Sequence, residues 1–66
     1  MQIVLNGATT DIQEGTSISD ILADLGFKDQ LIAVEVNQEV IPRGEHISFI
    51  LSPRDVVEII HAVGGG

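Results

Sequence analysis

The chain has 66 residues, enough for one domain and no more. Ten acidic residues against three basic ones give a formal charge of -7, which disfavours nucleic acid and anionic membrane surfaces as partners. There is no cysteine, so no disulfide can stabilise the fold, and no stretch approaches the roughly 18 apolar residues of a membrane-spanning helix.

A β-hairpin is predicted at the start of the chain. Residues 2–5 are largely apolar and are followed by Asn6-Gly7, a pair favoured in two-residue hairpin turns. Residues 8–13 are then the return strand. Glu14-Gly15 is expected to break the strand and lead into the next element.

An amphipathic helix is predicted next. Ser17 is placed to cap its first turn, and Asp20 sits where the acid of a capping box belongs. Gly26 is expected to end the helix, because glycine readily adopts positive φ. A helix this short needs a sheet to pack on. One apolar stripe at helical spacing is expected to face that sheet, formed by Ile18, Ile21, Leu22 and Leu25.

A second pair of strands is predicted after the helix. Residues 31–36 form a nearly continuous apolar run interrupted by Glu35, which is typical of a strand buried on at least one face. Asn37-Gln38 is expected to form a turn. A short strand over residues 39–41 follows, and Pro42 ends it.

The remaining chain is predicted to reach a final strand through irregular segments. Residues 42–45 read as a loop. Apolar residues alternate with others over residues 46–51, which allows a short strand without excluding a helical turn. Residues 52–55 are expected to form a turn, and residues 56–62 the last strand.

These elements predict an α+β fold. With one helix and one sheet, the large apolar burial available is the helix stripe against one sheet face. By analogy with the ubiquitin-like β-grasp arrangement, we expect a mixed sheet with the first and last strands parallel at its centre. We assign residues 1–62 to this domain and residues 63–66 to a flexible glycine tail.

The last strand is predicted to present an apolar residue beside that tail. If Val57 and Ile59 face the helix, alternation places Glu58, Ile60 and Ala62 on the outer face of the sheet. Ile60 and Ala62 are therefore candidate partner-binding residues. The alternative for Ile60 is that a neighbouring loop covers it.

The tail, Gly64-Gly65-Gly66, is the one segment with a chemical prediction attached. Without a Cβ, glycine can pass through a narrow channel in another protein. A carboxylate at its tip can attack the α-phosphate of ATP there, and sulfur or a thiol can open the resulting acyl adenylate to a thiocarboxylate or thioester. The alternative is a frayed chain end that is rich in glycine.

Three stretches carry a resemblance to a known family. Residues 1–7 (MQIVLNG), 34–43 (VEVNQEVIPR) and 55–66 (DVVEIIHAVGGG) resemble the ubiquitin-like sulfur carriers, and most closely those of thiamin biosynthesis. The similarity spans the whole chain. One departure is that the family often has Gly-Asp before the last strand, where this chain has Arg54-Asp55. This departure affects a turn, not the tail.

The resemblance implies a carrier that is itself no enzyme but a substrate of other enzymes. Gly65 and Gly66 match the family's terminal pair, and Gly66 would hold first an adenylate and then a thiocarboxylate. Val63 and Gly64 would line the channel of an ATP-dependent, E1-like adenylating enzyme. Further implied partners are a sulfur-donating protein and thiazole synthase. No bound cofactor is expected, since the activating partner uses the ATP and magnesium, and the default location is the cytoplasm.

Three other functions are weighed against this one. The small subunit of molybdopterin synthase shares the fold and tail chemistry, but that family tends to be longer and often has prolines before its tail, where residues 60–63 have none. A non-catalytic ubiquitin-like interaction module would have an inert tail. An enzyme is disfavoured, because no acid–base or nucleophile constellation is present.

Other polar residues are expected to be structural or solvated. His46 is expected in a loop or at a strand edge, and His61 is expected to be a structural or surface residue. Ser17 and Ser19 have no neighbouring base. We predict no metal site, since a solvated face explains the remaining acidic residues of this region better: Asp20, Asp24 and Asp29.

Overall fold

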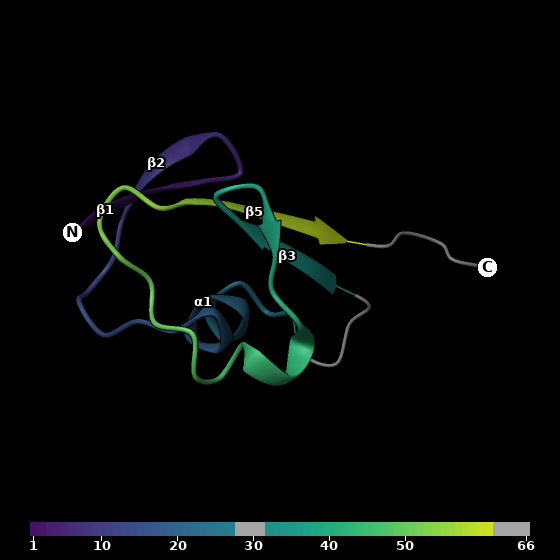
Figure 1. Cartoon of the computed structure of the whole chain (residues 1–66). Coiled ribbons are helices and arrows are strands. Elements are labelled where there is room, and N and C mark those ends of the chain that lie inside the picture. The colour runs from purple at the N-terminus through teal and green to yellow at the C-terminus, as the bar shows by residue number, and fades with distance from the viewer. Residues whose placement is uncertain (28–31, 62–66) are drawn as a thin grey trace.

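The computed structural model describes residues 1–27 and 32–61. A mixed sheet in the strand order β2-β1-β5-β3-β4 is covered on one face by helix α1 (Figure 1). β1 and β5 are parallel neighbours at the centre, as predicted. No helix in these two ranges is long and apolar enough to cross a membrane. The elements are β1 (Gln2–Leu5), β2 (Ala8–Asp11), α1 (Ile18–Asp24), β3 (Ile32–Val36), β4 (Glu39–Val40), a 3-10 helix (Arg43–Glu45) and β5 (Val56–His61).

Two-residue turns close both hairpins, as the sequence predicts. Asn6 and Gly7 join β1 to β2 with φ values of 49° and 84°. Asn37 and Gln38 join β3 to β4 with φ values of 53° and 69°. Positive φ at both positions is what the turn matching the twist of a β-hairpin requires, and asparagine tolerates it better than most residues.

The predicted capping box begins α1. The Asp20 backbone N–H donates to Ser17 Oγ at 3.0 Å, and the Ser17 N–H donates to Asp20 Oδ2 at 2.9 Å. The predicted stripe is wrong in one position, because Leu25 is exposed. The helix ends at Asp24, and Leu25 is its C-cap, so its side chain lies past the last turn that covers the sheet. Gly26 follows with φ of 82°, as expected for a helix stop.

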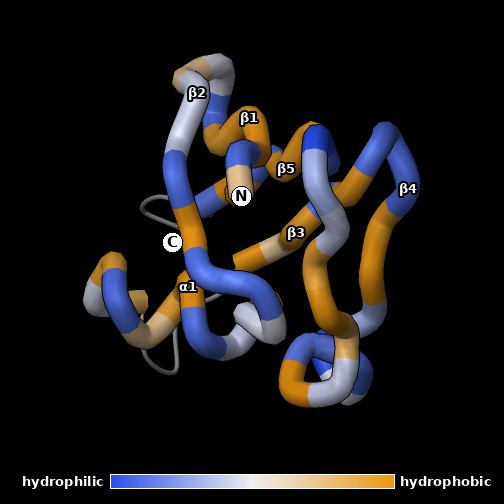
Figure 2. Tube along the Cα trace, turned by 90° about the vertical axis from the view of Figure 1, so that its left-hand side faces the viewer, coloured by the Kyte–Doolittle hydropathy of each residue, from blue (hydrophilic) through white to orange (hydrophobic). Residues whose placement is uncertain are grey.

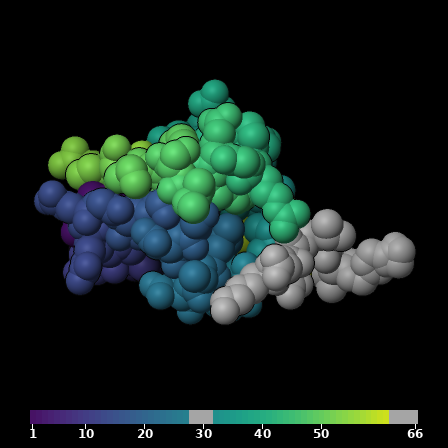
Figure 3. Space-filling model, turned by 90° about the horizontal axis from the view of Figure 1, so that it is seen from below, coloured from purple at the N-terminus to yellow at the C-terminus, as the bar shows by residue number. Residues whose placement is uncertain are grey.

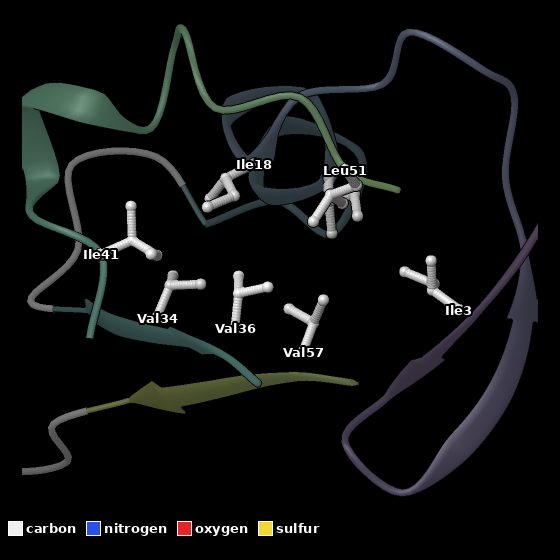
Figure 4. Close-up of a cluster of buried hydrophobic side chains, with 8 residues drawn as sticks. Ile3, Ile18, Val34, Val36, Ile41, Leu51 and Val57 are labelled. Atoms are coloured by element: carbon white, nitrogen blue, oxygen red, sulfur yellow. The ribbon is translucent and has the colours of Figure 1, made fainter. Parts of the chain in front are cut away.

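The core lies between α1 and the inner face of the sheet. Side chains from the strands point toward those from α1 and from the segment before β5 (Figure 4). Hydrophobic positions concentrate along β1, β5 and β3, whereas the β3–β4 turn is hydrophilic (Figure 2). The buried apolar residues are Ile3, Ile18, Ile21, Val34, Val36, Ile41, Leu51 and Val57.

The segment between β4 and β5 differs from the predicted loop at its start, and at residues 46–48 it forms a turn, the alternative to a strand. Residues 43–45, predicted as loop, form a short 3-10 helix, and residues 46–51 form no strand of the sheet. The Leu51 N–H instead donates to the Thr16 carbonyl oxygen at 2.9 Å, which ties this segment to the chain entering α1. Seen from below, this green segment lies beside the blue helical region (Figure 3). Leu51 is buried while Ile47 is exposed, so alternation here reflects packing on α1 and not a strand.

His46 lies in the turn after the 3-10 helix, in agreement with the expected loop position, and its side chain is buried. Its Nε2 lies 3.0 Å from the Ile41 carbonyl oxygen and donates to it. Its own carbonyl oxygen accepts from the Ser19 N–H at 3.0 Å. His46 therefore joins the 3-10 helix to the residue that follows β4 and to α1, which is a structural role.

Candidate functional site

The candidate site begins at the end of β5. This strand lies between β1 and β3, and it runs past the β1–β2 hairpin toward the side of the molecule opposite the N-terminus (Figure 1). Of the residues predicted to form the site, the structure describes Ile60. The others lie outside the described residues: Ala62, Val63, Gly64, Gly65 and Gly66.

Side chains of β5 alternate between the core and the outer face, as predicted. Val57 is 1% exposed and Ile59 packs against the core, whereas Glu58 points outward. Ile60 is also on the outer face and is 48% exposed. The alternative, in which a neighbouring loop covers Ile60, is therefore not what the structure shows. An apolar side chain is available on the strand that leads to the tail.

The outer face around Ile60 combines apolar and acidic side chains. Val56 of β5 and Val40 of β4 are also exposed apolar residues. Glu35 of β3 lies directly opposite Val40 on one side and Glu58 of β5 on the other. Like charges placed opposite each other destabilise a sheet. Such a face suits a partner that supplies apolar contacts and positive charge.

Two asparagine side chains hold the backbone of β5, a feature that the sequence reading missed. Asn37 Oδ1 accepts from the Val56 N–H at 2.9 Å, at the start of the strand. Asn6 Oδ1 accepts from the Ile59 N–H at 2.8 Å, in its second half. From the sequence, both residues are predicted only to form turns. No local pattern in the sequence indicates these bonds, because they depend on which strands flank β5.

The turn before β5 contains Arg54, at the position where the resembled family often has glycine. Arg54 has φ of 70°, a left-handed conformation that favours glycine. Asp55 holds the turn: its carboxylate accepts from the Ser52 N–H at 2.8 Å and from Asn37 Nδ2 at 3.0 Å. The glycine frequent in the resembled family thus suits the backbone here, and this chain places a side chain in the same conformation.

The remaining candidate residues lie elsewhere. The His61 ring lies 5.4 Å from the Phe27 ring, centroid to centroid. Asp24 and Asp20 line a surface hollow between β2 and α1, away from β5, and Asp20 is engaged in the capping box. Asp29 is outside the described residues. Across residues 1–27 and 32–61, no group of three or more histidine or acidic side chains is placed to hold a metal ion.

Comparison with known proteins identifies the family. A family model described as the ThiS family matches residues 3–66. The chain belongs to the ThiS family. The sulfur carrier protein ThiS of Bacillus subtilis is 38% identical over 63 residues, which cover 94% of this chain and 96% of that protein. The resemblance to thiamin-biosynthesis sulfur carriers is thus confirmed.

A solved structure confirms the ThiS-family fold. The crystal structure of the thiamine biosynthesis protein (ThiS) from Geobacter metallireducens matches with a TM-score of 0.83 and 26% identity, covering 100% of both chains. The predicted β-grasp fold is therefore correct.

Other relatives carry the ThiS-like segment within a longer protein. A thiazole synthase of Magnetococcus marinus is 38% identical over 66 residues, which cover 100% of this chain and 20% of that protein. A thiazole synthase of Paramagnetospirillum magneticum is 29% identical over the same span. The chain spans about a fifth of the length of these two relatives.

Proposed function

We propose that this chain is the sulfur carrier for formation of the thiazole ring in thiamin biosynthesis. The observation that carries the proposal is the match to a protein named as a sulfur carrier over 94% of this chain and 96% of the relative. An exposed apolar residue on the strand leading to a glycine tail supports it.

The proposed chemistry takes place at Gly66 and requires that this residue ends in a free carboxylate. A carboxylate oxygen attacks the α-phosphorus of ATP in an E1-like partner, forming an acyl adenylate while pyrophosphate leaves. Sulfur at the oxidation level of sulfide, delivered by a sulfur-donating protein, then attacks the acyl carbon. The carbon–sulfur bond forms as AMP leaves, and the product is a thiocarboxylate. Magnesium and ATP act in the partner and not on this chain.

The described residues supply the docking part of this proposal. Ile60, with Val56 and Val40 exposed on the same sheet face, gives apolar contacts for the activating enzyme, and Glu35 and Glu58 give acidic ones. Beyond β5, the next contacts toward Gly66 would come from the partner-binding and channel residues Ala62, Val63, Gly64 and Gly65.

Thiazole synthase is the proposed acceptor of the sulfur. Two relatives of that name contain a segment similar to this whole chain, which supports a functional connection between carrier and synthase. In this proposal the chain is a substrate of other enzymes and not an enzyme itself. We propose the cytoplasm as its location.

Intact mass spectrometry tests the proposal. The chain is incubated with an activating enzyme of this family, MgATP and a sulfur source, beside a copy that lacks Gly65 and Gly66. We expect a mass gain equal to replacement of one oxygen by sulfur in the full chain and none in the truncated copy. No gain in the full chain with several activating enzymes would overturn the proposal and favour a non-catalytic interaction module.

A further inference from the structure

We propose that Asn6 is a positioning residue for the carrier tail, because its side chain takes the place of a missing strand beside the second half of β5. This inference rests on the proposed carrier function and adds a residue to it. Asn6 is far from Gly66 in sequence and belongs to no motif of the tail.

The two sides of β5 are supported unequally. On the β3 side, residue pairing runs from Val57 to His61. On the β1 side it covers only Val56 and Val57, because β1 ends at Leu5 and the chain then turns. The second half of β5, which leads toward the tail, therefore has a strand on one side only within the described residues.

Asn6 extends the support on the β1 side by two residues. Its backbone N–H donates to the Val57 carbonyl oxygen at 2.9 Å, which continues the ladder of β1. Its side-chain Oδ1 then accepts from the Ile59 N–H at 2.8 Å, where the backbone carbonyl oxygen of Asn6 would act if β1 continued. The Asn6 side chain thus supplies the hydrogen bond that the backbone of β1 no longer supplies after the turn.

The residue type fits both demands on this position. The turn needs positive φ at Asn6, and asparagine and glycine adopt it with little strain. The bond to Ile59 needs a short side chain with an acceptor, which glycine lacks. Asn6→Gly therefore keeps the turn and removes the acceptor, whereas Asn6→Asp keeps both.

Loss of this bond should act on tail presentation. Ile59 lies seven residues before Gly66, so a wider range of strand directions at Ile59 gives a wider range of tail directions. If a smaller fraction of molecules presents the tail in the binding-competent direction, apparent affinity falls by that fraction. The chemistry at Gly66 is unchanged once the tail is bound. The expected effect is thus on KM for the carrier and not on kcat.

Asn37 provides a matched control in the same strand. It occupies the equivalent turn position, has positive φ, and accepts from a β5 N–H through its side chain. It binds Val56, at the opposite end of β5 from the tail, and it also donates to Asp55. Asn37→Gly should therefore reduce global stability at least as much as Asn6→Gly, but leave the tail end of β5 held.

The experiment compares the full chain with its Asn6→Gly, Asn6→Asp and Asn37→Gly variants. Amide hydrogen exchange at Ile59 is measured by NMR, and carrier-dependent AMP formation by the activating enzyme gives KM and kcat. For Asn6→Gly we expect the exchange rate of the Ile59 amide to rise about tenfold beyond the increase that the loss of global stability alone would cause. KM should rise about fivefold, the scale of one lost hydrogen bond. kcat should stay within about twofold, and Asn6→Asp should restore wild-type KM.

Two results would overturn the inference. Asn37→Gly could raise KM as much as Asn6→Gly, which would mean that general destabilisation explains the effect. Alternatively, Asn6→Gly could increase Ile59 exchange and leave KM unchanged, which would mean that the bond does not affect the tail. If activating enzymes form no AMP with the wild-type chain, the proposed function itself fails, and the exchange data still report separately whether Asn6 holds Ile59.

Discussion

The two faces of the sheet use neighbouring residues of β5 in opposite ways. Val57 is 1% exposed and belongs to the core, whereas the adjacent Val56 is 42% exposed on the outer face. The inner face gathers the residues that stabilise the fold. The outer face exposes apolar side chains to solvent and places Glu35 opposite Glu58. The difference indicates that stability is obtained on one face, which leaves the other available for recognition.

The largest effect should come from shortening a buried valine. Val57→Ala removes buried methyl groups and leaves a cavity, so we expect it to lower the free energy of unfolding by about 2–3 kcal/mol. Val56→Ala is the matched control and should change it by less than about 0.5 kcal/mol. Urea denaturation followed by circular dichroism measures both. Equal losses of unfolding free energy in the two variants would contradict the distinction between the inner and outer faces.

The next effect should fall on recognition alone. Ile60→Thr keeps a β-branched residue in the strand but removes part of the exposed apolar surface beside the tail. We expect KM of the activating enzyme for the carrier to rise about tenfold, with a stability change below about 0.5 kcal/mol. Ile47→Thr, at a 77% exposed position outside the sheet, is the control and should leave KM unchanged. A similar KM for the Ile60 variant and wild type would show that the outer face does not contribute to docking.

The turn before β5 sharpens the comparison, because it belongs to neither face. Arg54 adopts φ of 70°, so Arg54→Gly should relieve strain and raise the free energy of unfolding by about 0.5–1 kcal/mol. Arg54→Ala removes the charge but keeps a Cβ, and it should give no such gain. Thermal and urea unfolding of the pair separate conformation from charge. An equal gain in both variants would assign the effect to the arginine side chain and not to the backbone.

The smallest effect should be a gain in stability on the outer face. Glu58→Gln removes one of two opposed negative charges, so we expect about 0.2–0.5 kcal/mol of stabilisation at low salt. The gain should shrink at high salt, because salt screens exposed charges. In the Glu35→Gln background the same change should give less. A salt-independent gain that is the same in both backgrounds would show that the two carboxylates do not repel each other.

Local signals in the sequence were sufficient for much of the fold. Asn6-Gly7 predicted one hairpin turn, and Ser17 with Asp20 predicted the start of α1, because these structures depend on neighbouring residues. The segment over residues 42–51 was less predictable, since it also bonds through His46, Phe49 and Leu51 to residues 16–19, far away in sequence. The burial of His46 follows from that packing, whereas the hydrogen bonds of the 3-10 helix itself are local.

The candidate site was predictable in a similar, partial way. Alternation alone placed Ile60 on the outer face, and the structure agrees. The bond from Ile59 to Asn6 joins residues 53 apart, and the pairing of Glu35 with Glu58 depends on strand register, so neither could be read from a local pattern. The role of the tail was predicted from resemblance to a family, and its residues lie outside those the structure describes.

The most direct test of the carrier role is a single-turnover transfer. The chain is converted to its thiocarboxylate, purified, and mixed with thiazole synthase and the remaining substrates in the absence of any other sulfur source. The account predicts thiazole formation up to one equivalent of the thiocarboxylate, with recovery of the original mass of the chain. Thiocarboxylate that persists while no thiazole forms, although an established carrier supports the same synthase, would contradict it.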